Sequence, residues 1–269
     1  MLKAVQLCLT LLCITCVASI YGQDWAKARL EESPRHGEWV EIEQGDRKLQ
    51  AFLVFPEIKD KATAVIVIHE IFGLTDWVRG VADQLAEAGY IAIAPDLLSG
   101  MGKDGGGTSS FGGEEVRRAI AGLSLEQITA DLNAALKYVE ELPACNGKVV
   151  VTGFCWGGTQ TFNFATNNSK ILAAFPFYGT APREADAIAR IECPVYAFYA
   201  ENDARVNATI DDTKRQMQEH EKKFDSVMYD QAGHGFMRAG EAPDANTANK
   251  LAREAAWARL KEILSGLND

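Results

Sequence analysis

Short apolar segments alternate with amphipathic segments along most of the chain, and this alternation limits the possible fold more than any other feature. Short apolar runs that are rich in β-branched residues are typical of strands buried on both faces of a parallel sheet. The sequence predicts such strands at residues 64–68, 90–94, 148–152, 171–177, 195–200 and 226–229.

Helical periodicity fills the intervals between these strands. The clearest helix follows Ser124, which can form a capping box with Gln127. Further helices are expected after Asp76, from about Gly158 and over residues 208–222. Two helices have an apolar stripe, made of Leu125, Ile128, Leu132, Ala135, Leu136 and Val139 in one and of Ala252, Ala256, Leu260, Ile263 and Leu264 in the other.

Strands that alternate with helices predict an α/β fold with a mostly parallel central sheet and helices on both faces. Residues 38–44 and 47–55 flank Gly45-Asp46 and are expected to form an antiparallel hairpin at one edge. Residues 99–113 are rich in glycine, which indicates a long loop, and long loops in compact domains are usually functional or disordered.

The first 22 residues have the layout of a secretory signal peptide. Lys3 supplies the positive region, residues 4–20 carry no charge, and Gly22 is a small residue at a suitable cleavage point. We therefore expect residues 1–22 to be removed on export, to the periplasm or the exterior, and residues 23–269 to form a single domain. An uncleaved membrane anchor is the alternative, although the apolar run is slightly shorter than the roughly 20 residues of a transmembrane helix.

The charge of the chain argues against several classes of partner. It has 27 Lys and Arg against 37 Asp and Glu, a net charge of -10, without a basic cluster. An acidic surface repels nucleic acid and anionic membranes, so we expect neither as a partner of the mature form, which is predicted to be a monomer.

The cysteine count predicts at least one free thiol after export. Cys8, Cys13 and Cys16 would leave with the signal peptide, and the odd number that remains cannot pair completely in an oxidising compartment. A disulfide between Cys145 and Cys193 stays open, because the sequence does not give their separation.

A strand that runs into a G-x-C-x-G motif indicates which thiol is needed free. Residues 149–152 lead into Gly153-Phe154-Cys155-Trp156-Gly157, a nucleophile elbow with cysteine in the place of serine. Side chains at Gly153 and Gly157 would collide with the neighbouring strand and helix. The helix N-terminus favours the thiolate of Cys155. A buried structural cysteine is the alternative, since cysteine is among the most buried residues.

Two further residues complete the order nucleophile, acid, histidine that such folds use. Asp203 follows the strand at residues 195–200, and His234 lies between two glycines after the strand that ends at Tyr229. Glu201 competes with Asp203, whose alternative role is to cap the following helix. Because reactive groups gather at the carboxyl ends of parallel strands, we expect Cys155, Asp203 and His234 to meet there.

Five ordered motifs resemble those of the dienelactone hydrolase family over roughly residues 38–267. Three surround the residues just named, as Gly153 to Gly158, Glu201-Asn202-Asp203 and Gly233-His234-Gly235-Phe236, and the others are His69 to Gly73 and Ala94 to Leu97. The resemblance implies an α/β-hydrolase fold, which agrees with the predicted order of strands and helices.

The resemblance also implies roles for residues around the triad. Glu70 would contact the resting Cys155 and support catalysis, backbone N–H groups of Ile71 and Trp156 would form the oxyanion hole, and Arg238 would bind a substrate carboxylate. A surface pair with Glu241 is the alternative for Arg238. The second arginine of the family is replaced by Gly100, which argues against dienelactone itself as the substrate.

We therefore predict an enzyme that cleaves a small ester or lactone through a Cys-His-Asp triad and a thioester, with no cofactor and no metal. His69-Glu70 does not begin a zinc-binding H-E-x-x-H motif, because the fifth position is Gly73. The alternatives are a carboxylesterase or a peptidase-like hydrolase on the same fold, and a noncatalytic binding protein that retains the elbow.

Overall fold

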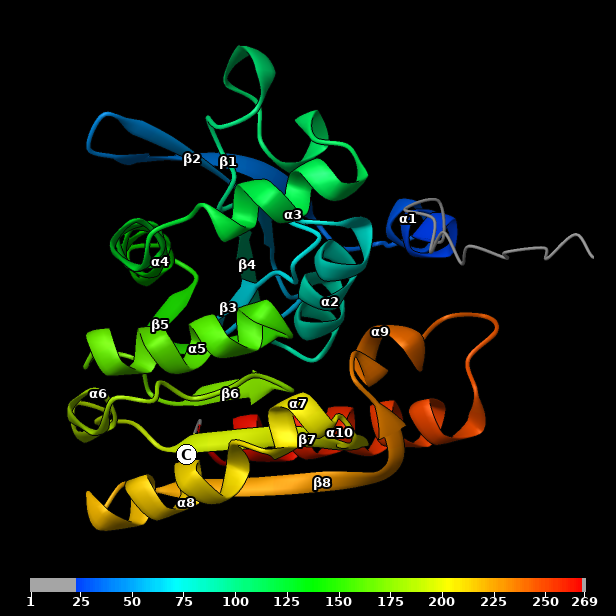
Figure 1. Cartoon of the computed structure of the whole chain (residues 1–269). Helices are drawn as coiled ribbons and strands as arrows, with labels where there is room; N and C mark the ends of the chain where they lie inside the picture. The colour runs from blue at the N-terminus through cyan, green and yellow to red at the C-terminus, as the bar shows by residue number, and fades with distance from the viewer. Residues whose placement is uncertain (1–22, 268–269) are drawn as a thin grey trace, which may run out of the picture.

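The predicted alternation of strands and helices is present in the structure, a computed structural model that describes residues 23–267 (Figure 1). Its strands form an eight-stranded sheet in the order β1-β2-β4-β3-β5-β6-β7-β8. The pairs β1–β2 and β2–β4 are antiparallel and the others parallel, so the edge hairpin is confirmed. The strands are β1 (Gly37–Gln44), β2 (Arg47–Val54), β3 (Ala62–Ile68), β4 (Ile91–Pro95), β5 (Cys145–Phe154), β6 (Ala174–Phe177), β7 (Val195–Asn202) and β8 (Phe224–Gly233).

Helices cover both faces of the sheet, as the alternation predicts. Alternate residues of one strand face opposite layers, so that Ile66 packs in one core and Val65 in the other. One core takes side chains from α4 (Leu125–Glu140), α5 (Trp156–Asn167), α6 (Ala185–Ala189), α7 (Ala204–Asn207) and α8 (Ile210–Glu219). The other takes side chains from α1 (Asp24–Glu31), α2 (Asp76–Glu87), α9 (Phe236–Ala239) and α10 (Thr247–Gly266).

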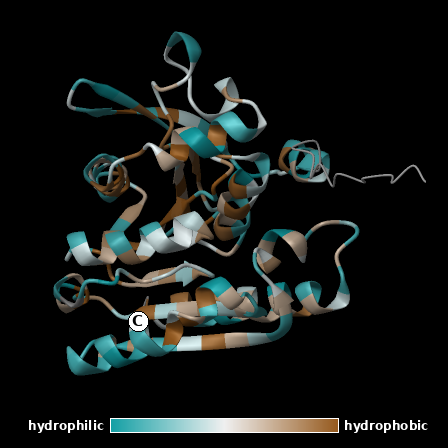
Figure 2. Ribbon diagram, viewed as in Figure 1, coloured by the Kyte–Doolittle hydropathy of each residue, from teal (hydrophilic) through white to brown (hydrophobic). Residues whose placement is uncertain are grey.

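The hydropathy of the ribbon follows this layering. The inner strands β3, β4 and β5 are predominantly apolar, whereas the outward sides of the helices are polar (Figure 2). All seven residues of β3 are buried, which explains why this strand reads as an unbroken apolar run in the sequence.

The glycine-rich segment is ordered, with two short 3₁₀ turns, η2 (Lys103–Gly105) and η3 (Thr108–Ser110), followed by α3 (Gly113–Ala121). Helix α3 was not expected from the sequence, because only Val116 and Ile120 of this helix are buried and its apolar face is short. They form a third, small core with Leu98, to one side of the main layers.

Several details of the helix predictions are wrong. The capping box at α4 is only half formed, because Ser124 Oγ accepts from the Gln127 N–H while the Gln127 side chain donates to Asp131. Leu125 is 47% exposed and not part of the apolar face. The N-cap residue of α2 is Thr75, whereas the sequence predicted Asp76, which is instead the first residue of the helix. The helix expected at residues 208–222 is present as α8 with shorter ends, and the short helices α1, α6 and α7 were not expected.

The expected signal peptide at residues 1–22 lies outside the described residues. Among residues 23–267, no helix is both long and apolar enough to cross a membrane. Cys145 and Cys193 are buried free thiols, so the disulfide that the sequence left open is not formed. Burial raises the pKa of Cys193 to about 12.

Candidate active site

The predicted nucleophile elbow is the turn between β5 and α5. Cys155 separates the two elements and has φ 59° and ψ -116°. A side chain at positive φ is strained by about 1–3 kcal/mol, and such strain persists only where the surrounding structure imposes it. Here the Cys155 N–H donates to the Phe177 carbonyl (3.1 Å), and the Cys155 carbonyl accepts from the Thr159 N–H (3.2 Å).

Three glycines allow this turn to pack against its neighbours. A Cβ atom on Gly153 would lie 2.3 Å from the carbonyl oxygen of Gly157, and one on Gly158 would lie 2.3 Å from that of Phe177. At Gly157 it would lie 2.4 Å from the carbonyl oxygens of both Ile68 and His69. The collisions expected from the sequence are therefore present, and they involve backbone that cannot rotate away.

The structure brings together the side chains of Cys155, Asp203 and His234, which the sequence predicted to meet. His234 Nε2 lies 3.0 Å from Cys155 Sγ, and His234 Nδ1 lies 2.5 Å from Asp203 Oδ2. Asp203 follows β7, His234 follows β8, and Cys155 follows β5, so all three stand at the carboxyl ends of parallel strands.

Asp203 and not Glu201 is the partner of the histidine. The exposed Glu201 accepts from the Gln231 N–H (2.6 Å) instead. The capping role considered for Asp203 is also present, because Oδ1 accepts from the Val206 N–H at the start of α7 while Oδ2 faces His234. The helix thus fixes the orientation of the same carboxylate that holds the histidine.

The pKa values of His234 and Asp203 depend on each other's charge. Burial alone would lower the pKa of His234, but the hydrogen bonds to Asp203 and Cys155 and their charges outweigh it and raise the pKa to about 9. For Asp203, burial favours the neutral acid, yet the bond and the charge of His234 lower the pKa of this carboxyl below its usual value. A histidine with this pKa is protonated at neutral pH, so its two N–H groups donate to Asp203 and to the Cys155 sulfur.

Glu70 does not make the contact that the resemblance implied. Its carboxylate, 1% exposed, accepts from Arg238 Nε (2.8 Å), whereas Cys155 Sγ faces His234. Burial raises the pKa of Glu70, and the neighbouring Arg238 offsets this only in part. Arg238 pairs with Glu70 and not with Glu241, its alternative partner, whose side chain accepts from Trp77 Nε1 (2.9 Å).

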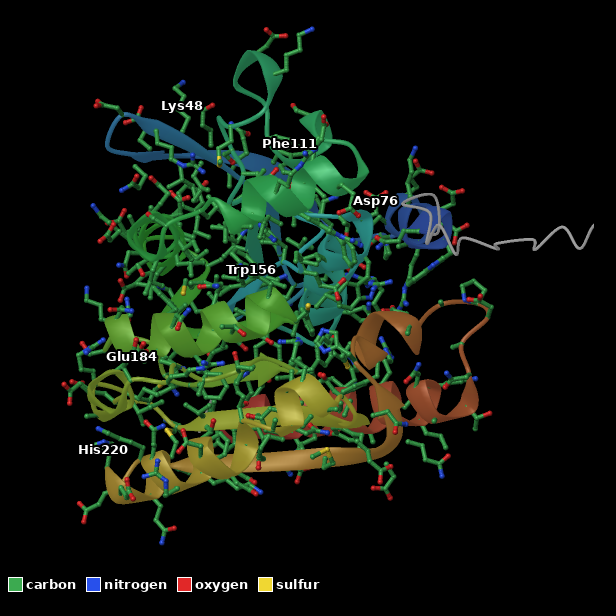
Figure 3. The ribbon with its side chains drawn as sticks, in the orientation of Figure 1. Lys48, Asp76, Phe111, Trp156, Glu184 and His220 are labelled. Carbon is green, nitrogen blue, oxygen red and sulfur yellow. The ribbon has the colours of Figure 1, made fainter. Side chains whose placement is uncertain are left out.

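The two residues proposed for the oxyanion hole come from the elbow itself and from the loop after β3. Trp156 is the first residue of α5, so its N–H has no carbonyl in a preceding turn to bond. Its ring stacks on that of the buried His69 (5.4 Å), next to the loop that carries Ile71. Trp156 is labelled on α5 in Figure 3, with Phe111 ahead of α3.

Tyr178, which directly follows β6, was not expected at the site from the sequence. Its ring is fully buried and packs edge-on against His234 at 5.0 Å, and its φ is 39°. Burial raises the pKa of this phenol well above its ordinary value. An aromatic residue immediately after a strand, before Gly179, was the only local signal for it.

Residues 23–267 contain no group of three or more His, Cys, Asp or Glu side chains arranged to hold a metal ion.

Comparison with known proteins shows the family of this chain. The model of the "Dienelactone hydrolase family" matches residues 49–267. The chain belongs to the dienelactone hydrolase family. The α/β-hydrolase fold and the hydrolase class expected from the sequence are thereby confirmed.

Relatives of this dienelactone hydrolase family member differ in the activities that their names give. A Salmonella typhi protein named "Putative carboxymethylenebutenolidase" is 30% identical over 81% of this chain and 83% of its own. A "Probable 2-oxo-3-(5-oxofuran-2-ylidene)propanoate lactonase" of Bradyrhizobium sp is 27% identical over 74% of this chain and 83% of its own. The crystal structure of a "Putative Dienelactone Hydrolase" from Klebsiella pneumoniae has a TM-score of 0.75 at 22% identity, over 86% and 98% of the two chains, and shows the shared fold.

The packing at the elbow predicts opposite effects for two glycine substitutions. Gly157→Ala should destabilise the enzyme by at least about 1–3 kcal/mol, because its methyl group meets two backbone oxygens. Gly80→Ala, in α2, meets no atom within 4 Å and should stabilise by about 0.5–1 kcal/mol. Urea unfolding of both variants measures the difference, and equal midpoints for the two would contradict this account of the turn.

The hydrogen bonds and charges around His234 predict an unusual titration of this side chain. Its ¹H–¹³C NMR signal, assigned through His234→Gln, should titrate near pH 9, and Asp203→Asn should move the midpoint down toward 6.5. Because the folded pKa is the higher one, this histidine's contribution to stability is complete below about pH 6.5 and is lost as the pH rises through about 9. A wild-type midpoint at or below 6.5 contradicts the coupling.

Proposed function

We propose that this enzyme cleaves a small ester or lactone by nucleophilic attack of Cys155, with His234 and Asp203 as the other members of a catalytic triad. The observation that carries the proposal is the position of His234, which bonds Asp203 on one ring nitrogen and Cys155 on the other. Membership of a family of lactone hydrolases supports the substrate class.

Acylation begins with the thiolate of Cys155, paired with protonated His234. The sulfur attacks the carbonyl carbon, the C–S bond forms, and the π electrons move onto the carbonyl oxygen. When this oxyanion collapses, the C–O bond to the leaving group breaks, and His234 Nε2 gives its proton to the leaving alkoxide. The products are an alcohol, or the hydroxyl end of an opened lactone, and a thioester on Cys155.

Deacylation uses the same histidine as a base. Neutral His234 takes a proton from a water molecule, whose oxygen attacks the thioester carbonyl. Collapse of the second oxyanion breaks the C–S bond, releases the acid and restores the thiolate beside protonated His234. Asp203, held by the N-terminus of α7, keeps the ring oriented through both steps.

The oxyanion of each step would lie between the backbone N–H groups of Ile71 and Trp156. Donors fixed before the reaction need no reorganisation when charge develops, and loss of one such donor typically lowers kcat by about 10²–10³. The role of Arg238 as an anchor for a substrate carboxylate stays a prediction. In the structure, Arg238 Nε donates to the Glu70 carboxylate. A carboxylesterase with the same triad differs from this proposal only in substrate.

Removal of the proposed nucleophile should abolish turnover. Cys155→Ala should lower aryl ester hydrolysis to background with an unchanged circular dichroism spectrum, and Cys155→Ser should retain a small fraction, because a hydroxyl ionises far less readily. Cys193→Ala removes a buried thiol outside the proposed triad and should keep wild-type turnover. Hydrolysis by Cys155→Ala at the wild-type rate would falsify the assignment and favour a noncatalytic role for the elbow.

Export is the second part of the proposal, and it rests on the uncharged run at residues 4–20. The mature enzyme from its native host should begin near Gln23 and lie outside the cytoplasm. Mass spectrometry of its N-terminal peptide makes the measurement, and an intact Met1 on cytoplasmic protein contradicts cleavage.

A further inference from the structure

The glycine-rich segment, which the proposed mechanism leaves without a role, is tied to two other loops by one side chain. The Thr108 N–H and hydroxyl donate to the two carboxylate oxygens of Asp96, both at 2.7 Å. The same hydroxyl oxygen accepts from the Leu74 N–H at 3.0 Å. Thr108 therefore joins the loop after β4 to the loop after β3.

The glycines of the segment are what allow this closure. A Cβ atom on Gly107 would lie 2.3 Å from Asp96 Oδ2, and Cβ atoms on Gly102 and Gly106 would collide with Ser110. Asp96 is 5% exposed and also accepts from the Leu98 N–H (3.1 Å). The segment thus folds around a buried carboxylate whose hydrogen bonds it completes, and a larger residue at these positions would hold Thr108 away.

The hydrogen bond that the Leu74 N–H donates to Thr108 holds the turn that contains Ile71. The Gly73 N–H donates to the Glu70 carbonyl (3.1 Å) across Ile71 and Phe72, and Gly73 has φ +75°. A Cβ atom on Gly73 would lie 2.4 Å from Thr108 Oγ1, so the turn and the threonine are in direct contact. Together with the bond to Leu74, this contact determines where the turn lies relative to the elbow.

The same segment also touches the second proposed oxyanion residue. The partly buried side chains of Ile71 and Trp156 both pack on the small core formed by Leu98, Val116 and Ile120. Figure 3 shows Phe111, which packs on this core as well, just ahead of α3. Residues 98–123 therefore contact both halves of the proposed oxyanion hole.

We propose that Thr108 is a positioning residue, which sets the backbone N–H of Ile71 in register with that of Trp156 through its hydrogen bonds to Leu74 and Asp96. The inference rests on the proposed function, because it presumes that these two N–H groups bind the oxyanion of an ester or lactone attacked by Cys155. Thr108 itself touches neither the substrate nor the reacting atoms.

The test is Thr108→Val in the full chain, with an aryl ester as substrate. Valine has nearly the shape of threonine but neither donates nor accepts, so the turn loses its tether while the packing is kept. Because a displacement of about 1 Å can lower a rate by about 10²-fold, kcat should fall by about 10–100-fold. KM should change less than twofold, and Thr108→Ser, which restores the hydroxyl, should recover most of kcat.

Two controls separate positioning from general damage. Thr166→Val removes the hydroxyl of a buried threonine, which donates to the Asn163 carbonyl (2.8 Å) at the far end of α5, and should leave kcat unchanged. Alkylation of Cys155 by iodoacetamide needs no oxyanion hole, so Thr108→Val should be alkylated at the wild-type rate. If Thr108→Val does not fold, Thr108→Cys, with a weak donor in the same place, should lower kcat at least threefold.

Turnover that depends on Cys155 but stays within twofold of wild type in Thr108→Val, or in Thr108→Cys where the valine variant does not fold, overturns this inference alone. Equal losses of kcat and of alkylation rate also overturn it, because they indicate a disturbed nucleophile. Turnover that survives Cys155→Ala overturns the proposed function, and this inference with it.

Discussion

The close approach of backbone to backbone around Cys155 is the constraint on which the site depends. The first residues of α5 contact the ends of β3 and β6 so closely that Gly157 and Gly158 have no room for a side chain. With strand and helix fixed on both sides, the connecting residue must turn sharply, and Cys155 takes a positive φ. The strain is sustained by the packing of the whole sheet, which presents the thiol at a fixed point above the strand ends.

The thiol faces His234, whose ionisation is determined by the charged groups around it. Two buried carboxylates each hold one partner, His234 for Asp203 and Arg238 for Glu70, and the His234 ring links Asp203 to the Cys155 sulfur. They differ in consequence, because the pKa of Asp203 is lowered whereas that of Glu70 is raised by burial. A carboxylate that stays charged holds the histidine protonated, and the protonated ring lies 3.0 Å from the Cys155 sulfur.

The sequence predicted those features that arise from local pattern. The strand before Gly153, the order of Cys155, Asp203 and His234, and the antiparallel hairpin all follow from short-range periodicity and glycine placement. The partner of Glu70 and the contacts of Thr108 could not be predicted, because they join loops separated by 168 and 34 residues. The exposed Leu125 shows the same limit, since an apolar residue at the first turn of a helix can extend beyond the layer that the helix covers.

The central claim is that the acyl group passes through Cys155, and mass spectrometry of the acyl-enzyme tests it most directly. Wild-type enzyme would be mixed with a slowly hydrolysed aryl ester, quenched in acid and digested. We predict an increase of one acyl group on the peptide that contains Cys155, removable by hydroxylamine, and accumulated in larger amount when Asp203→Asn slows deacylation. Turnover with the acyl group on another residue, or on none under conditions that preserve thioesters, would contradict the account.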